Sequence, residues 1–337
     1  MCWISKAVAF CVVCLAVASS LPSQEEQCIA PSVPIIVRDA HSLPIQGISP
    51  QDFVAKVGGK SVQIFSIALD SRPRRAVVLL DTSASMKADD SRHWKLPLDI
   101  AGDVVRSMSP NTQLAFLTFD DTVRNVIDFS GDNSAVLGQL SRMSAGEAFS
   151  KRDIQGQTAL YDAVYQGWHL LEKPSSADSL FVISDGEDTK SSLKLEALEE
   201  ILIGSGVRFF AVRVLSLENL THARSHLGGP PLAEIAGKTG GEVFGPVGFR
   251  LNGHIQFAFS NYEYGDKTKV EDALNWFYEG MIQSETLKIQ LPTEIPTDES
   301  LEVRLSTAAA HKWKGATLSY PRKLLHCVGL ADHLPTN

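Results

Sequence analysis

The feature that most constrains the fold is an alternation of short apolar runs with amphipathic stretches through the middle of the chain. The run at 76–80 is continuously apolar, as in a strand that is covered on both faces. The same reading places further strands at 113–119, 123–129, 180–184 and 207–214, and helices at 96–108, 158–171, 193–203, 232–239 and 270–282. This order predicts an α/β domain with a doubly wound, mostly parallel sheet covered by helices.

On either side of this region the pattern changes to short strands separated by turn residues. They are expected at 33–37, 53–57 and 62–67, and again at 287–291, 301–305 and 316–320. We expect the two sets to form one small β-sandwich into which the α/β domain is inserted. The corresponding boundaries are an N-terminal β segment at 29–70, the α/β domain at 73–284 and a C-terminal β segment at 285–327.

The first residues are typical of an export signal. Residues 7–18 are small and apolar after Lys6, and this run is too short to cross a hydrocarbon core of about 30 Å. Ala16 and Ala18 supply a small-x-small cleavage pattern, so we expect residues 1–18 to be removed. The alternatives are an uncleaved anchor or a buried strand. Cleavage predicts a secreted or periplasmic protein without a transmembrane segment.

Charge and cysteine content narrow the class further. With 31 Lys and Arg against 39 Asp and Glu, the formal net charge of −8 argues against a nucleic-acid partner. Three of the five cysteines fall within residues 1–18, which leaves Cys28 and Cys327 near the two ends. In an oxidising compartment this pair predicts a disulfide, and the alternative is two free thiols.

Oxygen-bearing side chains follow the ends of the predicted strands. Asp81, Ser83 and Ser85 come after the first α/β strand, Thr158 stands at a helix start, and Asp185 ends a later strand. Open α/β sheets bind ligands at this edge. Three hydroxyls and two carboxylates are hard donors that suit Mg²⁺, Mn²⁺ or Ca²⁺. The alternative is structural: Asp81 and Ser83 cap a helix, and Asp185 starts a turn.

Other candidate site residues are less specific signals of metal binding. Four further acidic residues follow predicted strands at the same edge of the sheet: Asp120, Asp121, Glu187 and Asp188. They could rim the site, but we expect them in solvated turns. His222 and His226 have a spacing that can chelate zinc on a helix, but the glycines and prolines around them predict a loop.

The ordered set Asp81-x-Ser83-x-Ser85, Gly-x-Thr158 and Ser184-Asp185-Gly186 resembles the metal-ion-dependent adhesion site of von Willebrand factor A-type domains. The resemblance covers residues 73–282, and the flanking β segments resemble the exported VWFA-related acidobacterial proteins. One departure is Gln157, where a second glycine is common in the family.

The resemblance implies a division of roles. The hydroxyls of Ser83, Ser85 and Thr158 would contact the ion, and Asp81 and Asp185 would act directly or through waters. A Glu or Asp of a partner protein would complete the coordination. Mg²⁺ is the ion we expect, with Mn²⁺ and Ca²⁺ as alternatives.

Enzyme motifs are missing from the sequence, which has no nucleophile elbow, phosphate loop, dinucleotide fingerprint or His-Glu-x-x-His helix. We therefore expect an exported protein-binding module rather than an enzyme. One alternative is an interaction protein with a vestigial metal site. The other is a metal-assisted hydrolase, which would need a general base that the sequence does not indicate.

Overall fold

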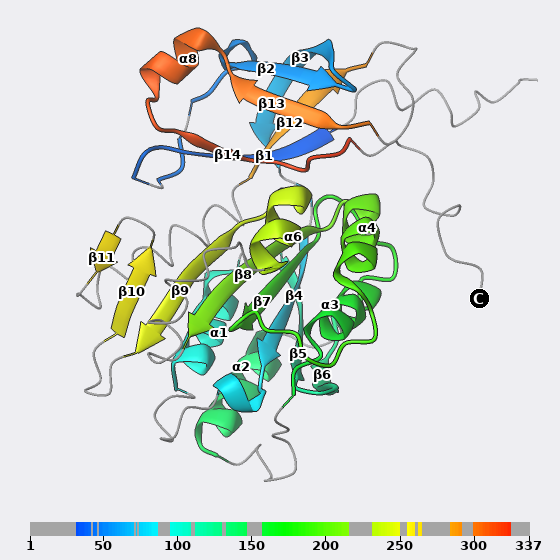
Figure 1. Cartoon of the computed structure of the whole chain (residues 1–337), viewed down its shortest axis with the longest axis vertical. Coiled ribbons are helices and arrows are strands. Elements are labelled where there is room, and N and C mark those ends of the chain that lie inside the picture. The colour runs from blue at the N-terminus through cyan, green and yellow to red at the C-terminus, as the bar shows by residue number, and fades with distance from the viewer. Residues whose placement is uncertain are drawn as a thin grey trace, which may run out of the picture.

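The computed structural model contains two separate sheets, and the smaller sheet lies at one end of the larger (Figure 1). It describes residues 32–41, 43–45, 47–70, 72, 74–86, 95–108, 112–129, 133–146, 157–215, 231–249, 255–259, 262–264, 284–291 and 299–324. Within these residues no helix has the length and apolar character needed to cross a membrane.

The larger sheet has eight strands in the order β11-β10-β9-β8-β7-β4-β5-β6. Its strands are β4 (Arg74–Asp81), β5 (Thr112–Phe119), β6 (Val123–Ile127), β7 (Ser179–Ser184), β8 (Arg208–Leu215), β9 (Val243–Phe249), β10 (Ile255–Phe259) and β11 (Tyr262–Tyr264). The five strands from β9 to β5 are parallel, and the strands at both edges run antiparallel. The predicted α/β sheet is thus present, with antiparallel edges added.

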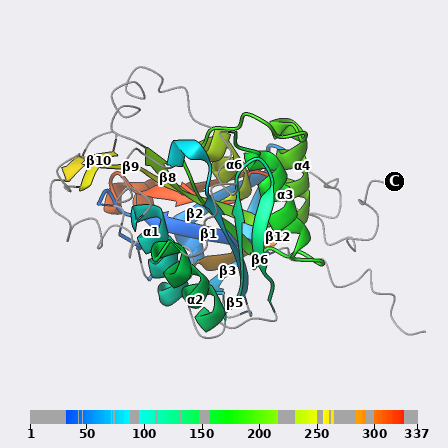
Figure 2. The same ribbon diagram turned by 90° about the horizontal axis from the view of Figure 1, so that it is seen from below.

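Helices cover both faces of this sheet (Figure 2). They are α1 (Lys95–Ser107), α2 (Asn133–Ser144), α3 (Leu160–His169), α4 (Leu195–Ser205) and α6 (Pro231–Thr239). One apolar cluster joins α1 and α2 to the sheet, and a second joins α3, α4 and α6 to its other face. Alternate residues of β4 enter the two clusters, Val78 the first and Val77 the second, which explains why this strand is apolar throughout.

The smaller sheet draws its strands from both ends of the chain. Its strands are β1 (Ser32–Arg38), β2 (Phe53–Val57), β3 (Lys60–Leu69), β12 (Glu285–Gln290), β13 (Leu301–Leu305) and β14 (Thr317–Ser319). They pair antiparallel in the order β13-β2-β3-β12-β1-β14. The chain also forms two short 3₁₀ turns, η2 (Pro50–Asp52) and η3 (Ala84–Met86), and the helix α8 (Thr307–Lys312). The finer expectation of a β-sandwich, and the exact domain boundaries, stay predictions.

The two sheets share buried contacts. Along β1, Ile35 packs in the core of the smaller sheet while its neighbour Ile36 packs in a core of the larger one. The guanidinium of Arg38 donates to both carboxylate oxygens of Glu242, at 2.6 to 3.0 Å, and both side chains are largely buried. The amide of Arg322 donates to the carbonyl of Lys238 at 2.9 Å. These contacts attach the smaller sheet to the end of α6.

The predicted site lies at the other end of the larger sheet. Strand β4 begins beside the smaller sheet and runs away from it, so Asp81 ends the strand on the far side (Figure 1). The chain leaves β4 for β5 on one side and later returns to β7 on the other, which makes the β4–β7 junction a switch point of the topology. Ligands bind in open α/β sheets at the carboxyl edge of such junctions.

Several expectations lie outside the described residues: the signal peptide, Cys28 and Cys327, the pair His222 and His226, and the helix at 270–282. The helices α2 and α8 and the strands β9 to β11 were not expected from the sequence.

Candidate metal centre

Two neighbouring strands bring the first acidic residue and its main partner together. Because β4 and β7 pair in parallel, with Leu80 opposite Ile183, Asp81 lies beside Ser184. The Ser184 hydroxyl donates to Asp81 Oδ2 at 2.6 Å and accepts from the amide of Gly186 at 3.0 Å. Ser184 therefore joins the two loops that follow these strands.

Asp81 is fully buried. Burial, and secondarily the charge of Asp185, raise its pKa to about 7, although hydrogen bonds from Ser184 and Ser83 act in the opposite direction. The cause is physical: a carboxylate loses hydration when it is buried, and a second carboxylate nearby repels its charge. The described residues around Asp81 thus leave its negative charge poorly compensated.

The two serines of the first loop approach each other. The amide of Ser83 donates to Asp81 Oδ1 at 2.8 Å, and the 3₁₀ turn η3 then brings Ser85 Oγ to 3.1 Å from Ser83 Oγ. Ser83 is buried and Ser85 is exposed, so the pair extends from the interior to the surface. The amide and hydroxyl of Thr82 both donate to the carbonyl of Phe119, at 2.7 and 2.9 Å, and hold this loop against β5.

Asp185 is buried as well, with 3% of its surface exposed. Its Oδ1 accepts from the amide of Glu187 at 3.0 Å, whereas Oδ2 is buried without a hydrogen-bond partner among the described residues. Buried carboxylate oxygens are nearly always paired, so an unpaired one needs an explanation. A bound cation would supply one, and the hard donors nearby would suit Mg²⁺, Mn²⁺ or Ca²⁺.

Thr158 reaches the same edge through backbone contacts. Its amide donates to Thr189 Oγ1 at 2.9 Å, and its carbonyl accepts from the amide of Lys190 at 3.0 Å. The next amide, of Ala159, donates to the carbonyl of Asp120 at 2.7 Å. Thr158 is buried between the β5–β6 turn and the loop after β7. Gly156 of the expected motif lies outside the described residues.

Three of the four remaining acidic residues have structural roles that the sequence did not indicate. Asp120 was expected in a solvated turn, but its carboxylate is fully buried and paired with Arg124 at 2.9 Å. Asp121 pairs with Lys190 at 3.0 Å. Asp188 Oδ1 accepts from the amide of Leu160 at 2.8 Å at the start of α3, which is a capping interaction. Glu187 is exposed, as expected.

Arg213 is a neighbour of the site that sequence reasoning missed. It lies near the end of β8, and its Nε donates to the backbone carbonyl of Asp185 at 3.1 Å. The only signal in the sequence was its position near the end of a predicted strand at the same edge.

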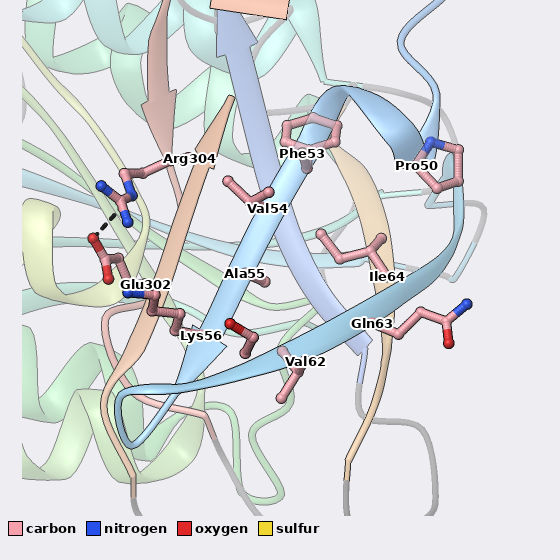
Figure 3. Close-up of a pocket in the computed structure, with 11 residues that line it drawn as sticks. Pro50, Phe53, Val54, Ala55, Lys56, Val62, Gln63, Ile64, Glu302 and Arg304 are labelled. Carbon is pink, nitrogen blue, oxygen red and sulfur yellow. Dashed lines mark ion pairs between the residues drawn. The ribbon is translucent and has the colours of Figure 1, made fainter. Parts of the chain in front are cut away.

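A separate pocket of about 420 Å³ lies in the smaller sheet, between β2 and β3 (Figure 3). Pro50, Phe53, Val54 and Ile64 line it, and the charged pair Glu302 and Arg304 stands beside it at 3.0 Å. Lys56, Ser61 and Gln63 also line it, so its lining is mixed in polarity. None of the strand-end donors belongs to it, and we do not assign it the chemistry of that site.

Comparison with known proteins gives a family match for part of the chain. A family model described as von Willebrand factor type A domain matches residues 76–187, a range that includes Asp81, Thr158 and Asp185. No curated protein matches the chain.

Three solved structures are among those to which the chain is similar. The mussel byssus proximal thread matrix protein 1 with a zinc-occupied MIDAS motif is 16% identical over 66% of this chain and 50% of that chain, with a TM-score of 0.43. BatB from Bacteroides thetaiotaomicron is 15% identical over 61% of this chain and 98% of its own, with a TM-score of 0.40. An aerotolerance-related membrane protein from Bacteroides fragilis is 16% identical over 62% and 99%, with a TM-score of 0.38. The chain thus spans half the length of the mussel protein.

Proposed function

We propose that the chain is an exported protein-binding module that recognises a carboxylate of a partner protein through a divalent cation, because residues 76–187 match the von Willebrand factor type A domain model. The residues that hold the cation are Asp81, Ser83, Ser85, Thr158 and Asp185. The observation that carries the proposal is the pair of buried carboxylates: Asp185 Oδ2 has no hydrogen-bond partner among the described residues, and Asp81 has a raised pKa.

The donor set supports this function because of its charge. Two carboxylates balance a divalent cation, and the three hydroxyls add ligands without adding negative charge. When bound, the cation supplies an electrophilic centre to which an anionic oxygen of the partner can bind. Ser85 is exposed, so the surface end of the donor set is accessible to that partner.

The chain's own residues keep the donors in place. Ser184 fixes the Asp81 carboxylate, the Thr82 contacts fix the serine loop, and the Lys190 amide fixes Thr158. Such support from residues behind the ligands sets the geometry and affinity of a metal site.

Export and the disulfide are parts of the same proposal. The signal pattern at residues 1–18 supports secretion or a periplasmic location, and Cys28 with Cys327 would then form a disulfide. Thiol counting on the purified mature protein under denaturing, non-reducing conditions tests the second point, and two free thiols would contradict it.

Loss of one hydroxyl tests the ligand assignment. We expect Mg²⁺ to raise the melting temperature of the wild-type protein, because a ligand that binds only the folded state stabilises it. Thr158→Val keeps the shape of the side chain but removes its hydroxyl, so the Mg²⁺-dependent rise should shrink or vanish. Thr122→Val, at an exposed position of the β5–β6 turn, is the matched control and should keep the full rise.

Three results separate this proposal from its alternatives. A rise that is equal in Thr158→Val and wild type would remove Thr158 from the site. No rise with Mg²⁺, Mn²⁺ or Ca²⁺ would favour an interaction protein with a vestigial metal site. Cation-dependent turnover of generic esters or phosphoesters would favour a hydrolase.

A further inference from the structure

Arg213 packs against the turn that carries Asp185. In the parallel pairing of β7 and β8, Arg213 lies opposite Ser184, one residue before Asp185. Gly186 lies in the same turn: its φ of +87° suits glycine, a Cβ there would lie 3.0 Å from Leu232 Cδ1, and Arg213 Nε would lie at contact distance, 3.9 Å from that Cβ. The guanidinium is partly buried in this position.

The arginine brings charge to the site without occupying a donor atom. Its Nε donates to the backbone carbonyl of Asp185, at 3.1 Å, and Asp185 Oδ2 is left without a hydrogen-bond partner in the described part of the chain. Burial lowers the pKa of Arg213, while the charges of Asp185 and Glu187 raise it. A guanidinium stays protonated in proteins, so Arg213 is a permanent cation beside the site.

This changes the charge balance of the site. A divalent cation between ionised Asp81 and Asp185 would give a neutral centre if those two were the only charged groups. Arg213 adds one positive charge that the centre does not cancel. Glu187 also lies nearby, but it is exposed and its charge is therefore screened by water and salt.

We propose that Arg213 makes this site bind a cation and a carboxylate together. The guanidinium repels the cation when the cation binds alone, and it attracts the carboxylate that then binds to the cation-loaded site. The inference rests on the proposed cation site and adds to it the reason for its selectivity: the complete complex is neutral only when a partner's carboxylate is present.

The test compares Mg²⁺ affinity with and without a simple carboxylate. Calorimetric titrations at pH 8 would use wild type, Arg213→Gln and Arg213→Lys, each in saturating sodium acetate and in sodium chloride of equal ionic strength. In chloride, we expect Arg213→Gln to bind Mg²⁺ at least about threefold more tightly than wild type, because the repelling charge of the guanidinium has been removed. Acetate should strengthen Mg²⁺ binding in wild type and in Arg213→Lys, and clearly less in Arg213→Gln.

A matched control removes an arginine elsewhere. Arg106 is exposed on α1 and pairs with Asp103 at 2.6 Å, so Arg106→Gln makes the same change of net charge away from the site and should behave as wild type. Thermal denaturation verifies that each variant folds. If Arg213→Gln does not fold, Arg213→Met keeps more of the aliphatic packing and replaces it in the same comparison.

The outcomes separate this inference from the function on which it rests. If no form of the protein binds Mg²⁺, Mn²⁺ or Ca²⁺, the cation site itself is refuted. If wild type and Arg213→Gln bind Mg²⁺ equally and respond equally to acetate, the role of Arg213 is refuted while the cation site stands. If Arg213→Lys behaves like Arg213→Gln, the hydrogen bond to Asp185 rather than the charge is responsible, and the inference is overturned as stated.

Discussion

Among single residues, Asp81 places the site under electrostatic strain. Folding raises the pKa of this carboxyl group from 3.8 to about 7. Below pH 3.8 the group is neutral in both the folded and the unfolded chain, so it costs the cation-free protein no stability. As the pH rises from about 4 to about 7, the unfolded chain releases this proton more readily and stability is lost. Bound cation would reverse the loss.

The expected consequence is that Asp81→Asn stabilises the cation-free protein at high pH. In the presence of a chelator at pH 8, the variant should be more stable than wild type by on the order of 2 kcal/mol, since the charge cost is removed and about one hydrogen bond is weakened. At pH 5 the difference should nearly disappear. Urea unfolding at both pH values measures it, and a variant that is less stable than wild type at pH 8 would contradict the raised pKa.

The ligand candidates could be predicted from sequence because they follow strand ends in a fixed order. The residues that hold these candidates in place could not be predicted from the sequence. Ser184 becomes the partner of Asp81 only through the register of β4 on β7, and Arg213 reaches Asp185 only because β8 pairs next to β7. Register between strands that are distant in the sequence leaves no local pattern in a single sequence.

Among elements, the strands and helices with strong periodicity were predicted well. Strand β7 was expected at 180–184 and spans Ser179–Ser184, and α4 was expected at 193–203 and spans Leu195–Ser205. Strand β9 was missed because Gly245 and Pro246 within it are typical of turns. A register irregularity between Val212 and Val214 of β8 accompanies this interruption.

The glycines at the end of α6 show how one element constrains another. A Cβ at Gly241 would lie 1.9 Å from the carbonyl oxygen of Phe209, so Gly241→Ala forces backbone to move and should destabilise the protein by about 2 kcal/mol or more. A Cβ at Gly237, within the same helix, would meet no atom within 4 Å, so Gly237→Ala should stabilise the protein by about 0.5–1 kcal/mol. Thermal or urea unfolding measures the change in stability of each variant, and equal changes in the two variants would contradict this packing.

For the whole molecule, the union of the N- and C-terminal strands in one β unit was expected, although as a sandwich, and the contacts between the sheets were not expected. The Arg38–Glu242 pair is one such contact, and Ser319 Oγ also donates to Glu242 at 3.1 Å. Because partners come from the two ends of the chain and from the α/β domain, only the folded structure shows them together.

Removing one member of this pair should be costly. Glu242→Leu leaves the buried guanidinium of Arg38 without its carboxylate, and we expect a loss of roughly 3 kcal/mol of stability. The double variant Arg38→Met with Glu242→Leu should recover part of that loss, because an apolar pair replaces an isolated charge. Urea unfolding of the single and double variants measures the coupling, and strictly additive losses would show that the two side chains do not stabilise each other.

The central claim is that Asp81 and its neighbours hold a divalent cation. Calorimetric titration of metal-stripped protein (residues 19–337) with Mg²⁺, Mn²⁺ and Ca²⁺ tests it most directly. We predict saturable binding to one site, loss of that binding in Asp81→Asn, and weaker binding at pH 6 than at pH 8, since protons compete for the Asp81 carboxylate below its pKa of about 7. Binding that is unchanged in Asp81→Asn, or no binding of any of the three ions, would contradict the claim.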